Sequence, residues 1–306
     1  MIISPRPASS DPPNGGFALL AVMSFLLVVA AASIPFFSSA TVQAKTVRNM
    51  VQETRERVLL QGLAELAGYY YVLQHATGAA ALPERIVCAP SAGLEVHFTF
   101  TNHSGLIDLN AAGLDLLVLG FRSLGTDTAV SSTLADDVVA NRSADLSIQS
   151  STKESPERVR GGYKHALYES VAELMELDLP HGISFDDLAG VFTTYSRSGT
   201  IDRAHTPPRL EATLSTVAES QMIFAVRDTR RLPALSVQAA LVRPSGTRTA
   251  LSAILGLAGD QDVQLLTPPR YLGRTTSSDL DLETGEVFCD EFFPAQAVDI
   301  IAEAVS

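Results

Sequence analysis

Positive charge is scarce in this 306-residue chain, which has 22 lysines and arginines against 34 aspartates and glutamates. The formal net charge at pH 7 is -12, and the pI is near 4.9. Nucleic-acid affinity comes largely from Lys and Arg side chains that replace the counterions of the phosphates. The composition therefore argues against a nucleic-acid partner.

Familiar catalytic motifs are also missing. The sequence has no Gly-x-Ser-x-Gly elbow, no phosphate loop, no His-Glu-x-x-His and no Cys-x-x-Cys. The histidines are scattered, and His97 and His103 fall on a predicted strand and the turn after it, where surface or packing roles are expected. We therefore expect a structural protein and not an enzyme.

One acidic segment resembles a metal-binding loop. Asp279, Asp281 and Glu283 in SSDLDLETGE have the alternate spacing of oxygen ligands for calcium. However, the glycine comes one place late and the last ligand is unclear, which favours a solvated acidic loop. We expect no cofactor, and calcium at these three residues is only a weak candidate.

Charge is absent altogether between Phe17 and Ala44. The run FALLAVMSFLLVVAAASIPFF, residues 17–37, would span about 30 Å as a helix, the thickness of a bilayer hydrocarbon core. Three interpretations are open: a signal peptide cleaved after Ala44, a plain signal anchor, or the N-terminal helix of a prepilin. The run is longer than a usual signal-peptide core, and the leader before it lacks a basic cluster.

Helical periodicity continues beyond the apolar run. Apolar residues recur from Val47 to Leu73 at the spacing of one helix face, with polar residues opposite. Pro35 is expected to kink this helix and not to end it. The pattern predicts one helix of some 55 residues, apolar all round in its first half and amphipathic in its second.

The start of that helix resembles the cleavage site of type IV prepilins and pseudopilins. A short polar leader ends in Asn14-Gly15-Gly16, and the apolar run begins at Phe17. The resemblance implies that a prepilin peptidase cuts after Gly16 and methylates the amino group of Phe17. Ordinary pilins have Glu as the fifth mature residue, whereas this chain has Ala21, so a special position in a filament is implied.

A pentapeptide occurs twice, as SGLID at 104–108 and SGTID at 198–202. The match is either chance or the mark of two strand-turn-helix units, and we favour two units because Leu116 and Leu210 also align. The candidate residues of the repeat motif are Gly105, Ile107, Asp108, Asn110, Gly199, Ile201 and Asp202.

Together with the segment IDLNAA at residues 107–112, this repeat resembles general secretion pathway protein K, the large minor pseudopilin of type II secretion. That family has an Asn-Leu-Asn-Thr-Ala type motif after a strand, a helical insertion in the pilin head and a second similar motif at its far end. The resemblance covers residues 14 to about 245, and the second copy departs from it by reading IDRAH.

The predicted fold class is α+β, with a long N-terminal transmembrane and pilin helix and an antiparallel pilin-like sheet that carries a large α-helical insertion. The expected parts are a leader (1–16), the N-terminal helix (17–76), the head (77–110 and 216–306) and the insertion (111–215). Segments 221–230 and 234–244 are predicted to form a strand pair that closes the sheet.

The resemblance implies a single-pass protein of the bacterial inner membrane, with its N-terminus in the cytoplasm and its head in the periplasm. Its partners would be other minor pseudopilins, bound through parallel N-terminal helices at the tip of the pseudopilus, and the prepilin peptidase. The alternative is a membrane-anchored periplasmic binding protein or enzyme with an ordinary signal anchor.

Cysteine is limited to Cys88 and Cys289. A periplasmic head permits a disulfide between them, and neither cysteine belongs to a metal or nucleophile motif. Two buried free thiols are the alternative. We favour the disulfide, which would tie the C-terminal tail to the start of the sheet.

Overall fold

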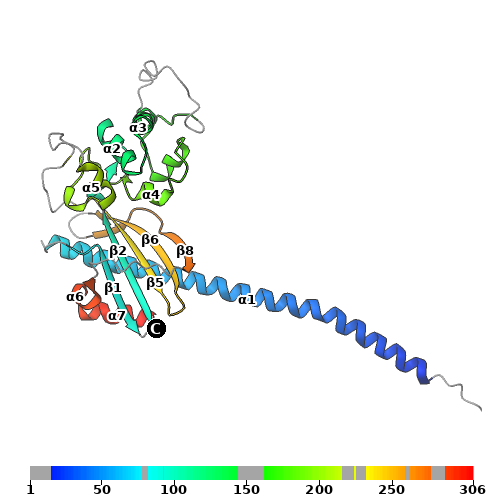
Figure 1. Cartoon of the computed structure of the whole chain (residues 1–306). Coiled ribbons are helices and arrows are strands. Elements are labelled where there is room, and N and C mark those ends of the chain that lie inside the picture. The colour runs from blue at the N-terminus through cyan, green and yellow to red at the C-terminus, as the bar shows by residue number, and fades with distance from the viewer. Residues whose placement is uncertain are drawn as a thin grey trace, which may run out of the picture. The chain divides into compact units, whose positions relative to one another are not determined.

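The computed structural model describes residues 15–77, 82–91, 93–143, 162–215, 224, 232–258, 262–276 and 287–305. The chain divides into two compact units, Met1–Glu56 and Arg57–Ser306. Figure 1 labels the main elements. In chain order they are α1 (Gly15–Ala76), β1 (Arg85–Ser91), β2 (Leu94–Asn102), η1 (His103–Gly105), β3 (Ile107–Asp108), α2 (Leu114–Ser123), α3 (Thr128–Arg142), η3 (Val171–Glu176), α4 (Phe185–Ala189), β4 (Phe192–Thr193), η4 (Arg203–His205), α5 (Pro208–Leu214), β5 (Ala234–Val242), β6 (Thr247–Ala258), β7 (Asp262–Leu265), β8 (Arg270–Thr276), β9 (Val287–Phe288), α6 (Cys289–Phe292) and α7 (Ala295–Val305).

Helix α1 is continuous past Pro35, as expected from the periodicity. In the first unit the large apolar side chains that the structure describes are exposed, with Leu19 at 69% and Leu27 at 71% relative exposure. The predicted membrane span is not supported by the described residues, among which no helix is both long enough and apolar enough to cross a bilayer. The leader, residues 1–14, lies outside the described part of the chain.

The second unit contains a seven-stranded sheet in the order β7-β6-β5-β2-β1-β9, with β8 paired to β6 beside β7. The sheet is mixed and not wholly antiparallel, which corrects the prediction: β9 runs parallel to β1. The strand pair that closes the sheet is also different. Strand β5 pairs with β2 and β6, while residues 221–230 lie outside the described residues except for Phe224, which forms a parallel bridge with Ile201.

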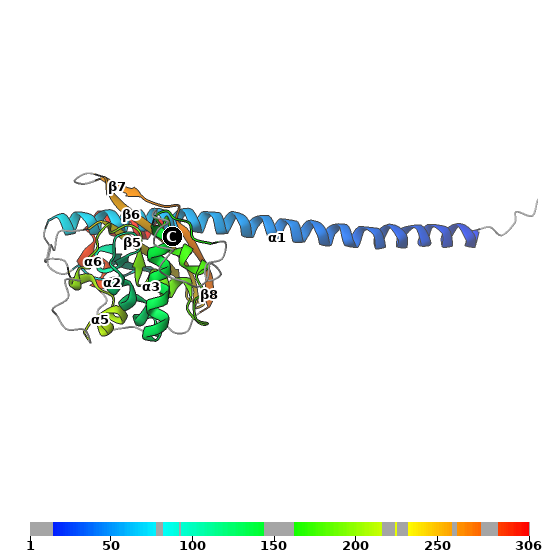
Figure 2. The ribbon, with the colours of Figure 1, turned by 90° about the horizontal axis from the view of Figure 1, so that it is seen from above.

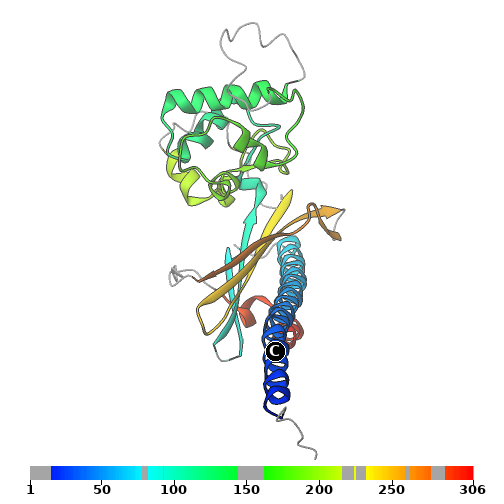
Figure 3. The ribbon, with the colours of Figure 1, turned by 90° about the vertical axis from the view of Figure 1, so that its right-hand side faces the viewer.

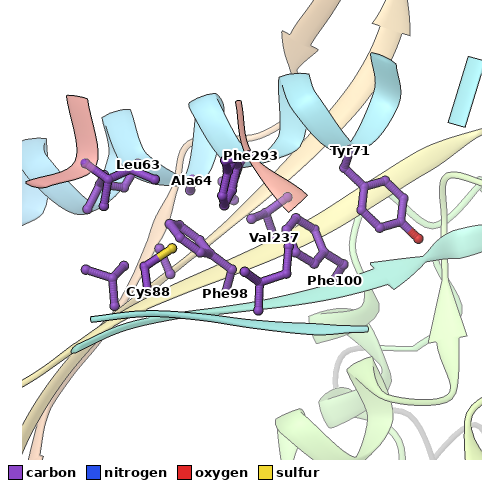
Figure 4. Packing of buried hydrophobic residues seen from close by; sticks show 14 of the residues in the cluster. Leu63, Ala64, Tyr71, Cys88, Phe98, Phe100, Val237 and Phe293 are labelled. Carbon is purple, nitrogen blue, oxygen red and sulfur yellow. The ribbon is translucent and has the colours of Figure 1, made fainter. Parts of the chain in front are cut away.

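One face of this sheet packs against the last turns of α1. Figure 4 shows Leu63, Ala64 and Tyr71 of α1 above the side chains of β1, β2 and β5. Tyr71 stacks on Phe100 with ring centroids 4.7 Å apart, and Phe98 is 1% exposed. In Figure 2 these turns of α1 lie alongside β5 and β6. Burial of one helix face on alternate strand residues gives the head its core.

A second core lies within the chain between β2 and β5. It is formed by β3, α2, α3, η3, α4 and α5, and its buried members include Leu117, Phe121, Leu174 and Phe192. Figure 3 shows these helices beyond one end of the sheet. Since Asn102 at the end of β2 lies opposite Leu235 near the start of β5, the chain leaves the sheet and returns to it at neighbouring positions.

The C-terminal tail completes the first core. Cys289, Phe292 and Phe293 are buried there together with Ala297 and Ile301 of α7. The apolar stretch at 295–305 forms the helix α7 and contacts β1. The predicted disulfide is confirmed: Cys88 of β1 is bonded to Cys289 of α6, with Cα atoms 4.7 Å apart.

Candidate functional site

The two copies of the repeat share an order of local structure. In the first copy Ile107 of β3 is followed by a turn at 109–111 and then by α2, and in the second copy Ile201 is followed by η4 at 203–205 and then by α5. The two isoleucines are equivalent: Ile107 pairs in parallel with Phe192, and Ile201 pairs in parallel with Phe224. Both isoleucines are buried, as are the aligned leucines Leu116 and Leu210.

The two copies are docked on each other through their glycines. A Cβ added to Gly105 would overlap the carbonyl oxygen of His205. Equivalently, a Cβ added to Gly199 would lie 3.0 Å from the carbonyl oxygen of Ala111. With the offset of the repeat (198 minus 104, 94 residues), Gly105 corresponds to Gly199 and Ala111 to His205, so the contact is reciprocal and the copies are related by an approximate twofold.

The repeated aspartates hold the turns. The Asp108 carboxylate accepts hydrogen bonds from the backbone amides of Asn110 at 2.8 Å and Ala111 at 3.1 Å. Its second oxygen accepts from the amide of Arg197 at 2.7 Å, so it also ties the first copy to the second. Asp202 caps η4 by accepting from the amide of Ala204 at 3.0 Å. Short polar side chains at such positions satisfy amides that the following turn leaves unpaired.

Asn110 joins the first repeat to the chain before η3. Its side-chain amide donates to the carbonyl of Tyr168 at 2.9 Å, and its carbonyl accepts from the amide of Tyr168 at 2.7 Å. An asparagine presents one donor and one acceptor in the spacing of a backbone peptide. This pair of hydrogen bonds gives a physical reason for Asn at this motif position.

Arg142 is a site residue that sequence reasoning missed. From the last turn of α3, its guanidinium donates to the carbonyls of Leu109 and Ala112 at 2.6 Å each. The planar fork of arginine suits two acceptors side by side. No local signal in the sequence relates Arg142 to the motif 30 residues earlier.

His103 joins the insertion to the sheet. Its Nδ1 lies 2.7 Å from Oγ1 of Thr193, and its Nε2 lies 2.7 Å from Oγ of Ser236 on β5. Burial lowers the pKa of His103 to about 4, so the ring is neutral near pH 7 and has one donating and one accepting nitrogen. The predicted packing role agrees with this position, but the bonds to two hydroxyl groups were not foreseen.

A second contact between the sheet and the insertion lies on β8. The guanidinium of Arg270 is 4.2 Å from the ring centroid of Phe185, and its Nη1 is 3.4 Å from Oδ1 of Asp186. Both side chains of the ion pair are exposed, so the pair adds little stability. Of these two contacts, the one made by His103 is the buried one.

The processing residues and the weak calcium candidates are separate from the repeat. Gly16 and Phe17 lie in the first turn of α1. Asp279, Asp281 and Glu283 lie outside the described residues. Among the described residues no group of three or more His, Cys, Asp or Glu side chains is placed to hold a metal ion.

No protein-family model matches this sequence, and no curated protein matches it. Among solved structures, the chain is similar to a chain of the GspK-GspI-GspJ complex from the enterotoxigenic Escherichia coli type 2 secretion system, with a TM-score of 0.50 and 10% identity. The match covers 75% of this chain and 99% of that chain. At this identity the likeness shows the fold alone: this protein has a pseudopilin-like fold.

Proposed function

We propose that this protein is the K-type minor pseudopilin of a type II secretion system, with a structural and not a catalytic role. The observation that carries the proposal is the fold match, which covers 99% of a chain from a complex of GspK, GspI and GspJ. The docked repeats add support, because the resemblance in sequence rests on the same motif residues, such as Asp108 and Asn110.

Helix α1 supports a role in assembly. The helix exposes large apolar side chains in both units. Phe25 in the first unit is 68% exposed, and Val58 in the second is 66% exposed. Exposed apolar surface of this extent marks a membrane or protein contact. We propose that the uncharged run 17–37 lies in the inner membrane and packs in parallel with the helices of other minor pseudopilins, while the head lies in the periplasm.

The tip of the filament is the proposed position. Ala21 stands where a carboxylate is expected in an ordinary pilin, so one interaction of repeated stacking is absent. The insertion extends the head beyond the end of β2 and β5 (Figure 3). Its bulk would obstruct a subunit stacked above it, and a terminal position avoids that obstruction.

Mass spectrometry of the purified protein tests the processing step. We expect a mature N-terminus at methylated Phe17. An N-terminus at Lys45 would point to a signal peptide, and an intact Met1 would point to a plain signal anchor.

The matched variants are Gly16→Ala and Gly15→Ala. Gly16→Ala should leave most of the precursor uncut, because the peptidase reads the residue before the cut, whereas Gly15→Ala should be processed normally. The secretion assay follows: an uncut precursor should fail to restore export of folded proteins in a strain that lacks this gene. Normal processing of Gly16→Ala would count against the proposal.

A further inference from the structure

The C-terminal tail, residues 287–305, contributes aromatic side chains to the head core. Phe293 lies 5.7 Å from Phe98 and 5.8 Å from Tyr70 between ring centroids. Phe292 lies 6.0 Å from Phe100 and 6.5 Å from Tyr71. These partners belong to α1 and β2, so the tail covers the line where the helix meets the sheet (Figure 4).

The backbone gives this tail little hold on the sheet. Among the residues that the structure describes, which begin at Val287 in this tail, β9 pairs with β1 at two positions, Ile86 with Val287 and Val87 with Phe288. The preceding strand, β8, pairs with β6, whereas β9 of the tail pairs with β1 at the other edge of the sheet. The tail is therefore not paired with the strand before it in the chain. A side-chain bond from Nε2 of Gln74 to the carbonyl of Phe292, at 2.6 Å, ties the tail to α1.

The disulfide stands at the start of the docked segment. Cys289 follows β9 directly and opens α6, and Cys88 is the next residue of β1 after the two paired positions. Both cysteines are buried, at 8% and 1% exposure. The covalent bond therefore fixes the register of the short parallel pair and places the two phenylalanines over the core.

We propose that the Cys88–Cys289 disulfide is a redox-dependent lock on the C-terminal tail, and that the head is completed only after the bond forms. In the closing step the two thiols lose two protons and two electrons to a disulfide of a thiol oxidase of the compartment, which leaves as a dithiol. In the reduced protein the tail separates from β1 and α1, which uncovers Phe98, Phe100 and Tyr71. The lock rests on the tail contacts and not on the proposed secretion function, so either can fail alone.

Hydrogen exchange of the folded, purified protein tests the lock, with and without the reductant tris(carboxyethyl)phosphine. On reduction we expect amides of residues 289–305 to lose protection by at least tenfold, and amides of 63–74 in α1 to lose part of theirs. Residues 114–142 of the insertion serve as the internal control, because their core contains no tail residue. They should exchange at the same rate in both samples.

A double variant, Cys88→Ala with Cys289→Ala, separates the bond from the reagent. It should exchange like the reduced protein, and addition of the reductant should change nothing further. Equal protection of the tail in the oxidised and reduced proteins overturns the lock. Loss of protection throughout residues 57–305 on reduction overturns it too, since the bond would then hold the whole fold and not the tail.

Discussion

At the scale of single residues, the glycines of the repeat are fixed by backbone and not by side chains. Gly105 has no room for a Cβ because the His205 carbonyl is in the way, whereas Gly113 at the start of α2 has no atom within 4 Å of that position. We expect Gly105→Ala to lower the free energy of unfolding by at least about 2 kcal/mol, since backbone must move.

Gly199→Ala should cost less, about 1 kcal/mol, because its Cβ would be 3.0 Å from the Ala111 oxygen. Gly113→Ala is the control for a glycine with open space, and it should cost only about 0.5 kcal/mol, because Gly113 is the N-cap of α2 and alanine is a poorer cap than glycine. Urea unfolding of the three variants measures the order. Equal stability of Gly105→Ala and Gly113→Ala would contradict the docked arrangement of the two copies.

His103 has a testable dependence on pH. Its pKa is about 4 in the folded protein, lowered by burial, against about 6.5 in the unfolded chain. Between these values the unfolded chain binds more protons, so stability falls as the pH falls from about 6.5 to about 4, by an upper figure of about 3 kcal/mol. Above pH 6.5 this contribution is fully present.

The variant His103→Gln has no group that titrates at this position, and its side-chain amide can still donate one hydrogen bond and accept another. The difference in free energy of unfolding between wild type and variant, measured by urea unfolding, should be constant above pH 6.5. It should shrink by up to about 3 kcal/mol as the pH drops to 4. A difference that stays constant over the whole range would show that His103 is not held neutral by the fold.

At the scale of elements, the close contact of α1 with β6 involves a glycine of the helix. A Cβ on Gly68 would overlap the Leu255 side chain of β6, whereas Gly62, six residues earlier in the helix, has open space. Gly68→Ala is expected to destabilise the head by about 1–3 kcal/mol through overpacking. Gly62→Ala should stabilise it by up to about 1 kcal/mol, because alanine is the better helix former.

Thermal unfolding of the two variants checks this pair. Opposite shifts of the unfolding temperature identify packing at Gly68 as the cause, because the replacement of Gly by Ala raises the helix propensity equally at both positions. A rise in both variants would mean that α1 is not packed closely on β6.

Elements differ in how far the sequence could predict them. Helix α1 was predictable because its apolar residues repeat every three to four positions over many turns. Strand β9 was not, because a two-residue strand has no periodicity and owes its parallel pairing to the docked tail. The disulfide was predictable for a simple reason: the chain has only Cys88 and Cys289.

The same division holds in the candidate site. The pentapeptide identified Asp108 and Asp202, since turn chemistry is local. The partners of the first turn, Arg142 and Tyr168, come from distant parts of the insertion. Only the tertiary fold brings them together, so no window of the sequence contains the signal. His103 was visible as a residue but not as a bridge to Ser236.

At the scale of the whole molecule, the two cores predict a head that folds without its insertion. The first core takes its members from α1, β1, β2, the sheet strands after Leu232 and the tail, and the second from residues 107–214. The ends of the insertion meet at the sheet, where Asn102 lies opposite Leu235. Adjacent antiparallel strands lie about 5 Å apart, a gap that a short turn can bridge.

We therefore expect a chain in which Gly-Asn-Gly replaces residues 104–231 to keep the Cys88–Cys289 bond and a cooperative unfolding transition. Free thiols counted in denatured, unreduced protein should be none, and near-ultraviolet circular dichroism should retain the signal of the packed aromatic rings around Phe98. The matched control is the same deletion with Val237→Asp, which places a charge in the head core where Val237 is 0% exposed and should abolish folding. If the shortened chain has two reactive thiols and no cooperative transition, the head depends on the insertion, and the junction at His103 is then part of one core and not a link between two.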